Sequence, residues 1–327
     1  MFPETRMRRL RRTQNIRSMV QEIHLNMSDY IYPIFAVEGE DMVNPIPSMP
    51  GINQYSLDHI LEEVQRAVDV GVVAIMLFGV PAHKDDHGSE AYNEDGIIQK
   101  AIRLIRSAYP DLVITTDVCM CEYTDHGHCG IIHDHGVDND ATLSMLAKIA
   151  VSHAKAGADM LAPSDMMDGR IGVIRKALDD AGFKDVIIIA HSVKYASSFY
   201  GPFRDAAGSA PQFGDRKAYQ MDPASGTRQA LQEVELDIAE GADMAIVKPS
   251  LAYLDLIKEV HERYLLPVVA YNVSAEYAMV KAAAMNGWID EKKVVLEIMN
   301  SFKRAGASLV ITYHAIDLGH WLKEDAQ

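Results

Sequence analysis

Cysteine is scarce in this chain of 327 residues, which contains only three. So few cysteines cannot build the disulfide framework of a small secreted protein, and they favour a reducing compartment. All three nevertheless lie in one short segment, at Cys119, Cys121 and Cys129. Their concentration in one place is the first feature of the sequence that needs a chemical explanation.

Positive charge and long apolar runs are also in short supply. The chain has 31 lysines and arginines against 46 aspartates and glutamates, a formal net charge of -15. Because phosphate contacts need lysine and arginine, this balance argues against general binding to nucleic acid or acidic membranes. The longest apolar run, residues 70–82, is too short to span a membrane. No apolar signal-peptide core follows the arginines of residues 6–12, so we expect a cytoplasmic protein.

The cysteine-containing segment, residues 117–130, also holds His126 and His128. Thiolate and imidazole ligands suit zinc better than magnesium or calcium. Three sulfur ligands would leave the fourth zinc position for water or substrate, which is the arrangement of a catalytic site. The alternatives are reduced thiols without a metal, or a disulfide between two of them. Whether either histidine is a ligand stays open.

Short β-branched runs alternate with helix-length segments from Tyr30 onward. Near-continuous apolar strands between amphipathic helices are typical of a parallel sheet covered by helices. Eight such units predict an α/β fold, a closed (β/α)8 TIM barrel, with an open doubly wound sheet as the alternative. The expected strands are 31–37, 72–78, 112–116, 159–162, 186–190, 244–247, 268–271 and 308–311. The expected helices are 57–68, 95–108, 141–156, 171–181, 228–240, 253–264, 275–286 and 291–304.

The first 28 residues differ from the rest of the chain. They are basic, yet they carry too many apolar side chains for a purely solvated tail. We therefore expect residues 1–28 to form an N-terminal arm that packs on a neighbouring subunit, and residues 29–327 to form a single catalytic barrel. This division predicts a homo-oligomer.

Two of the expected strands lead into lysine, the fifth into Lys194 and the sixth into Lys248. Active sites of such barrels lie at the carboxyl ends of the strands. Burial at the end of an apolar strand lowers the pKa of a lysine, and two ammonium groups in one cavity would lower it further. A neutral lysine amine attacks carbonyl carbon to give a Schiff base. The alternative is a lysine that reaches solvent or pairs with a carboxylate.

A long connection, residues 195–227, follows the fifth expected strand. A loop of this length inside a compact barrel is usually a lid or a binding loop. Arg204, Arg216 and Lys217 would supply the cations that an acidic protein needs for a carboxylate substrate. The alternative is a solvated loop with ordinary surface charges.

These features together resemble the porphobilinogen synthase family, also called the delta-aminolevulinate dehydratases. The resemblance implies a TIM-barrel enzyme that condenses two molecules of 5-aminolevulinate into porphobilinogen, with loss of two waters. It also implies an octamer whose N-terminal arms embrace neighbouring subunits. The matching segments are 8–13, 48–51, 117–130, 162–170, 194–204, 247–250 and 273–274.

The resemblance also implies roles for the catalytic residues. Lys248 would form the Schiff base with the substrate that becomes the propionate side of the product. Lys194 would serve the second substrate as a further Schiff-base or proton-handling lysine. Asp117 and Ser164 would orient amino groups.

Substrate binding and metals follow from the same resemblance. Arg204 and Arg216 would hold the carboxylate of the acetate-side substrate, and Ser274 and Tyr313 that of the other substrate. The cysteine segment resembles the zinc-using branch of the family. Glu233 falls where some bacterial members bind a regulatory magnesium ion away from the active site.

Two other functions are compatible with the residues themselves. A class I aldolase on the same barrel would need only one lysine and no zinc. A non-catalytic protein could use the cysteines merely to buffer zinc. An assay for pyrrole formation and the effect of a chelator would separate the three.

Overall fold

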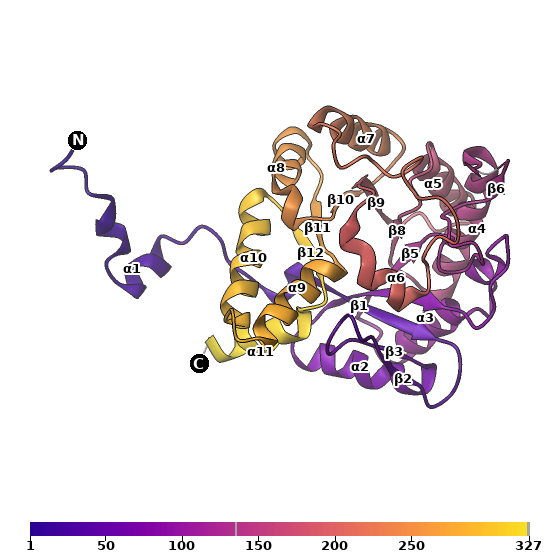
Figure 1. Ribbon diagram of the computed structural model, residues 1–327, viewed down its shortest axis with the longest axis horizontal. Helices are drawn as coiled ribbons and strands as arrows, with labels where there is room; N and C mark the ends of the chain where they lie inside the picture. The colour runs from indigo at the N-terminus through magenta and orange to yellow at the C-terminus, as the bar shows by residue number, and fades with distance from the viewer. Residues whose placement is uncertain (135, 326–327) are drawn as a thin grey trace.

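Parallel strands close into a barrel at the centre of the molecule (Figure 1). This computed structural model describes residues 1–134 and 136–325. The last barrel strand pairs with the first through Tyr30–Val310 and Ile31–Ile311, which confirms the predicted TIM barrel and excludes the open sheet. In hydrogen-bonded order the barrel strands are β1 (Tyr30–Val37), β4 (Ala74–Val80), β5 (Val113–Val118), β8 (Met160–Pro163), β9 (Ile187–Lys194), β10 (Met244–Lys248), β11 (Val268–Asn272) and β12 (Leu309–Thr312).

Most barrel strands extend further toward their carboxyl ends than the apolar pattern predicted, and three of these extensions include predicted catalytic residues. β5 continues through Asp117, β9 through Lys194 and β10 through Lys248. Asp117, Lys194 and Lys248 are polar, so the strands continue beyond the apolar runs from which they were predicted. Because Lys194 and Lys248 are paired across β9 and β10, the two side chains start from adjacent points on the barrel rim.

Helices cover the outside of the barrel (Figure 1), and all eight predicted helices are present. Each buries an apolar stripe, as in α2, where Ile60, Val64 and Ala67 face the core. The covering helices are α2 (Leu57–Asp69), α3 (Ile97–Ala108), α4 (Asn139–Ala156), α5 (Arg170–Asp180), α7 (Thr227–Ala239), α8 (Leu254–Arg263), α9 (Ser274–Met285), α10 (Glu291–Ala305) and α11 (Ala315–Asp325).

The helix that follows the last strand, α11, was not predicted. Gly319 lies within it, and glycine inside a helical pattern normally weakens the expectation of a helix. A Cβ atom at this position would lie 2.6 Å from Cβ of Val70 at the end of α2. The glycine is therefore required by close packing of the two helices.

Several shorter strands and a short helix lie outside the eight-stranded barrel. β2 (Val43–Pro45) and β3 (Asn53–Tyr55) form an antiparallel hairpin beside β1. β6 (Ile132–His133) and β7 (Gly136–Val137) form a second short pair. A short helix, α6 (Gly201–Ala207), lies within the long connection after β9.

The N-terminal segment extends away from the barrel (Figure 1). Its 3-10 helix η1 (Met7–Arg11) and its helix α1 (Gln14–Met19) contain no buried residue. Apolar side chains of this segment, such as Leu10 and Met19, are exposed. Across the described ranges, no helix combines the length and the apolar character needed to cross a membrane.

Candidate active site

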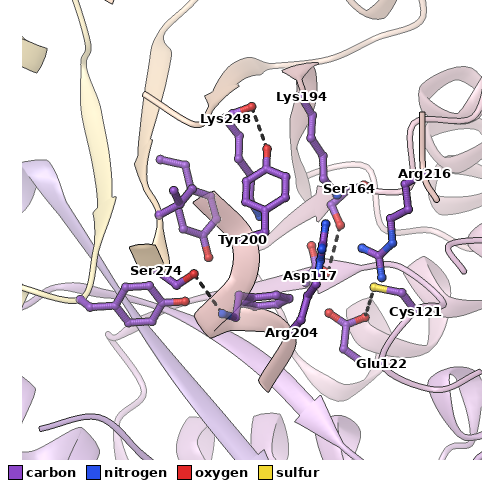
Figure 2. A pocket seen from close by; sticks show the side chains of 14 residues that line it. Asp117, Cys121, Glu122, Ser164, Lys194, Tyr200, Arg204, Arg216, Lys248 and Ser274 are labelled. Atoms are coloured by element: carbon purple, nitrogen blue, oxygen red, sulfur yellow. Dashed lines mark hydrogen bonds between the residues drawn. The ribbon is translucent and has the colours of Figure 1, made fainter. Parts of the chain in front are cut away.

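A pocket of about 440 Å³, its mouth included, lies at the carboxyl ends of the barrel strands (Figure 2). All eight residues predicted to transform or bind the substrates line it. The strands β5, β9, β10 and β11 and the lid segment after β9 each contribute side chains. The lining residues are Asp117, Cys121, Glu122, Ser164, Lys194, Tyr200, Phe203, Arg204, Arg216, Lys248, Tyr271, Val273, Ser274 and Tyr313.

Aromatic rings surround the amine of Lys248. Its Nζ atom lies 4.0 Å from the ring centre of Tyr271, 5.4 Å from that of Phe203 and 5.6 Å from that of Tyr200. The Tyr200 hydroxyl donates a hydrogen bond of 3.0 Å to the backbone carbonyl of Lys248 and so fixes its own ring beside the lysine. The amine therefore lies in an aromatic enclosure that keeps water away from it.

The two lysines have opposite protonation tendencies. Burial, followed by the nearby charge of Lys194, lowers the pKa of Lys248 to about 7. Burial also acts to lower the pKa of Lys194, but the negative charges of Cys129 and Cys119 outweigh it and raise that pKa above its ordinary value. The predicted mutual lowering therefore applies to Lys248 alone, because the charge of Lys194 is the largest one acting on Lys248, whereas the cysteines provide the largest charges acting on Lys194. Lys248 is suited to attack as a neutral amine and Lys194 to act as a cation or proton donor.

Two buried carboxyl groups lie beside the lysines. Burial, then the charge of Glu122, raises the pKa of Asp117 well above its ordinary value. Burial, then the charge of Cys121, raises the pKa of Glu122 to about 8. The Ser164 hydroxyl donates a hydrogen bond of 3.1 Å to Asp117 Oδ2. Asp117 Oδ1 and Glu122 Oε1 have no hydrogen-bond partner within the described ranges, so both are free to bind a substrate group.

The three cysteine side chains form one buried group. Their sulfur atoms lie within 4.8 Å of one another, and all three thiols are free, which excludes the disulfide alternative for this structure. Cys119 Sγ and Cys121 Sγ are 3.4 Å apart. Three convergent buried thiols fit a soft cation, since thiolate ligands select zinc over magnesium or calcium. Cys121 also lines the pocket, so an ion held by this group would face the substrates.

The histidines of the same segment contact other groups in this structure. His128 uses Nε2 with the Phe213 carbonyl at 2.9 Å and Nδ1 with the Tyr219 hydroxyl at 3.0 Å. His126 Nδ1 accepts a hydrogen bond of 3.0 Å from the His128 backbone. Neither ring joins the three sulfurs in a ligand group among the residues that the structure describes.

Two arginines reach the pocket from the lid segment, residues 195–227. Arg216 is buried, and its guanidinium donates a hydrogen bond of 2.8 Å to the Gly127 carbonyl, which ties the lid to the cysteine segment. Arg204 lies on α6 and is half-buried. The Nε atoms of Arg204 and Arg216 have no hydrogen-bond partner among the described residues, so they can donate to an anionic ligand. Lys217 does not belong to this site: it is exposed and lies 3.8 Å from Asp215.

The opposite wall carries the other predicted binding pair. Ser274, at the start of α9, accepts a hydrogen bond of 3.0 Å from the backbone of Phe203. Its hydroxyl thereby connects the lid to the barrel. The Tyr313 hydroxyl is buried in the pocket wall and has no partner in the described part of the chain.

Sequence reasoning missed several residues that shape the pocket. Tyr271 and Glu122 could have been found, since one precedes the polar end of a barrel strand and the other follows Cys121 directly. Lys84 was missed because it lies in a polar loop after β4, among Asp and His residues, where a lysine normally belongs to the solvated surface. Its amine donates a hydrogen bond of 2.8 Å to the Gly208 carbonyl, at the end of α6. Gln54 Nε2 donates one of 2.6 Å to the Ala206 carbonyl, so two side chains fasten the lid helix.

A family model described as delta-aminolevulinic acid dehydratase matches residues 4–321, nearly the whole chain. The chain belongs to the delta-aminolevulinic acid dehydratase family. A dehydratase of this name from Synechococcus elongatus is 56% identical over 326 residues, covering 98% of this chain and 100% of that protein. Another, from Halalkalibacterium halodurans, is 57% identical over 320 residues, covering 98% of this chain and 97% of that one.

A crystal structure of a dehydratase of this family is also similar to the whole chain. The enzyme from Toxoplasma gondii, also described as porphobilinogen synthase, superimposes with a TM-score of 0.96 at 47% identity. The match covers 98% of this chain and 92% of that one, and that enzyme is in complex with its reaction product porphobilinogen. The resemblance read from the motifs is thereby confirmed at the level of the family.

Proposed function

We propose that the protein is a porphobilinogen synthase, a lyase that joins two molecules of 5-aminolevulinate into porphobilinogen with loss of two waters, in tetrapyrrole (heme) biosynthesis. The observation that carries this proposal is the pairing of Lys194 with Lys248 on adjacent strands, with a pKa of about 7 for Lys248. Both lysines share one pocket with Cys121 of the thiol group. The named relatives and the product complex of the Toxoplasma gondii enzyme support the same activity.

Lys248 supplies the nucleophile. Its neutral amine attacks the ketone carbon of one 5-aminolevulinate. Departure of the ketone oxygen as water, with one proton taken from an acidic group of the pocket such as protonated Glu122, leaves an iminium. The iminium acidifies the neighbouring carbon and withdraws electrons from it, which prepares this carbon for bond formation with the second substrate. The surrounding rings of Tyr271, Phe203 and Tyr200 exclude water from the lysine.

Lys194 supplies charge and protons to the second substrate. Its amine donates a hydrogen bond to the Ser164 carbonyl, which aims it at the pocket. The free oxygens of Asp117 and Glu122 are placed to accept hydrogen bonds from the substrate amino groups. The pKa of Glu122, raised to about 8, allows this carboxyl group to exchange protons near neutral pH, and burial raises the pKa of Asp117 as well.

We propose that Cys119, Cys121 and Cys129 hold a zinc ion. Their sulfur atoms provide three convergent ligands and leave room for a fourth from the pocket. Zinc, when bound, supplies Lewis-acid polarisation of a carbonyl or lowers the pKa of a bound water. The charge of Cys129 is the largest of those that raise the pKa of Lys194.

Two carboxylate clamps hold two identical substrates in different poses. Arg204 and Arg216 bind one carboxylate from the lid side, and Ser274 and Tyr313 bind the other from the barrel side. Holding both reactants in attack geometry converts a bimolecular step into an effectively unimolecular one. The lid segment closes the pocket over them.

The test of this function is pyrrole formation from 5-aminolevulinate by the purified protein, with and without a chelator. We expect porphobilinogen to form and the chelator to abolish its formation. Chelator-resistant turnover of a single keto substrate would favour the aldolase, and absence of any product would favour a metal-buffering protein.

The rate of Schiff-base formation is expected to rise with pH through the pKa of Lys248, about 7. Only the neutral amine attacks, so kcat/KM should fall about tenfold for each pH unit below that value. Replacing Lys194 by methionine removes the charge that is the second cause of the low pKa. In this variant the rate of borohydride trapping on Lys248, which does not need the second substrate, should rise at a higher pH than in the unaltered protein. A profile that is flat from about pH 6 to 8 contradicts the assignment.

We also propose a homo-octamer in the cytoplasm, in which residues 1–28 form an arm and residues 29–327 the catalytic barrel. The exposed apolar side chains of the arm, Leu10 and Met19 among them, support burial against a neighbouring subunit. A reducing compartment fits the free thiols. Light scattering of the full chain and of a variant without residues 1–28 should give an octamer and a smaller species.

A regulatory magnesium ion is proposed at Glu233, outside the active site. Glu233 lies on α7 and lines a groove with Asp168, Asn139 and Gln229. Burial is the largest influence on its pKa, followed by the opposing charge of Arg170 and by Asp237, and the net effect raises the pKa. One or two carboxylates are enough for magnesium, which keeps several of its waters.

Magnesium should raise the activity of the chain and the share of its largest oligomer, and Glu233→Gln should lose both responses. Lys258→Ala, an exposed change on α8, is the matched control and should keep them. Turnover and oligomer size measured across a magnesium titration decide the matter. No response in the unaltered protein would discard the site.

A further inference from the structure

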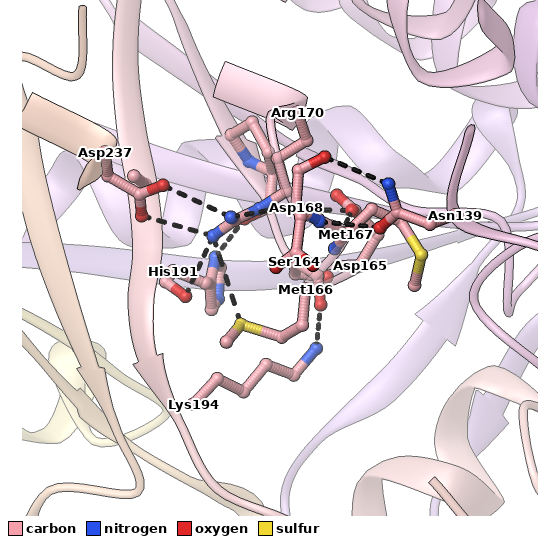
Figure 3. Close-up of polar contacts among 12 residues, drawn as sticks. Asn139, Ser164, Asp165, Met166, Met167, Asp168, Arg170, His191, Lys194 and Asp237 are labelled. Atoms are coloured by element: carbon pink, nitrogen blue, oxygen red, sulfur yellow. Dashed lines mark hydrogen bonds and ion pairs between the residues drawn. The ribbon is translucent and has the colours of Figure 1, made fainter. Parts of the chain in front are cut away.

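Arg170 is a buried arginine behind the active-site pocket, and its guanidinium links three elements (Figure 3). It pairs with Asp237 of α7 through two contacts of 3.2 Å. It also donates to the Met167 carbonyl at 3.3 Å, in the loop after β8, and to the His191 carbonyl at 3.2 Å, on β9. One side chain therefore connects α7, the loop and β9.

The loop and the strand held by Arg170 are the two parts of the backbone that place Lys194. His191 lies on β9, the strand that ends at Lys194. Met167 lies in the loop that begins at Ser164, whose carbonyl accepts the hydrogen bond from the Lys194 amine. The Ser164 hydroxyl also contacts Asp117, so a shift of this loop would move two catalytic groups together.

The loop has a conformation that needs support from its surroundings. Met166 has a φ of 69°, in the left-handed region that residues with a side chain rarely adopt. The Asp165 carboxylate accepts a hydrogen bond of 2.8 Å from the Met167 backbone and lies 3.9 Å from Arg170 Nε. Such a backbone persists only where neighbouring groups determine it.

We propose that Arg170 and Asp237 are positioning residues that set the location of the Lys194 amine relative to Asp117. Neither lines the pocket, so neither touches substrate. A buried ion pair gives little net stability over apolar side chains of similar size. The two parallel contacts with Asp237 instead fix the orientation of the planar guanidinium group. The guanidinium in turn holds the Met167 and His191 carbonyls, which lie in the two segments that place Lys194.

The first test is Arg170→Gln, assayed in the full chain with 5-aminolevulinate; the inference rests on the proposed function of Lys194. We expect kcat to fall about 100-fold, the cost of a misplacement of roughly 1 Å, with KM within about threefold of the unaltered value. Borohydride trapping of substrate on Lys248, measured at a pH where this amine is neutral, should be unchanged, because aromatic rings and not Arg170 surround that amine. If Arg170→Gln lost borohydride trapping and turnover to the same extent, the whole pocket would be disturbed and the proposal would be overturned.

Arg175→Gln is the matched control. Arg175 lies on the same helix and also donates to backbone carbonyls, those of Val186 at 2.7 Å and Phe183 at 3.0 Å. These contacts are at the opposite end of β9 from Lys194. The variant should therefore keep kcat, and an equal loss of kcat in both variants would contradict a specific role of Arg170.

A double variant, Arg170→Met with Asp237→Leu, separates positioning from stability. Replacement of both charges avoids the unpaired Asp237 that Arg170→Gln leaves, so the double variant should be the more stable of the two, although both remove the cation beside Asp165. We expect a melting temperature close to that of the unaltered protein together with the same loss of kcat. Recovery of kcat to within about threefold of the Arg175→Gln value would show the pair to be merely structural. If the unaltered protein makes no pyrrole, the proposed function has failed instead.

Discussion

Replacing Lys248 by alanine is expected to abolish pyrrole formation and, with it, covalent trapping of substrate by borohydride. The side chain is the buried amine whose pKa is about 7, and no other lysine of the pocket shares that property. Loss of a covalent nucleophile removes the iminium and the electron sink, so we expect turnover to fall by more than about 1,000-fold. Peptide mapping of the trapped unaltered protein should place the label on Lys248.

The effect should depend on the amine itself and not on the volume removed. Lys248→Met keeps the length of the side chain among the rings of Tyr271 and Phe203, yet it should be as inactive as Lys248→Ala. Lys258→Ala removes an exposed lysine from α8, the helix after β10, and should leave turnover unchanged. Normal turnover in either Lys248 variant would exclude Schiff-base chemistry at this position.

Much of the site could be predicted from the sequence because the barrel converts order along the chain into position in space. Carboxyl ends of parallel strands meet on one rim, so polar residues directly after apolar runs, such as Asp117, Lys194 and Lys248, are brought together. The three cysteines were equally clear because they lie close in sequence and are the only ones in the chain.

Other features depend on contacts between distant segments, which no local pattern contains. The raised pKa of Lys194 results from thiolates that lie far from it in sequence. The hydrogen bond from Lys84 to the end of α6 joins residues 124 positions apart. Gly319 argues against a helix in the sequence, and only its close packing against Val70 explains why glycine occurs there.

Removing the metal is expected to stop pyrrole formation while leaving Schiff-base formation at Lys248 intact. The three buried sulfurs form a separate group from the aromatic box around the Lys248 amine, so one can be lost without the other. A chelator, or Cys129→Ser, should reduce bound zinc by direct metal analysis and turnover in proportion. Borohydride should still trap one substrate on Lys248.

A change beside the cysteines that leaves the thiols intact is the control for metal removal. Met120 lies between two of the cysteines and is fully buried in the main core, so Met120→Leu alters the packing of the segment without touching a thiol. This variant should keep both zinc and turnover, and zinc should restore the chelated protein. Full turnover at zero metal content would instead mean that Lys248 works alone, as in a single-lysine aldolase. The thiols would then matter only for the charge that they place beside Lys194.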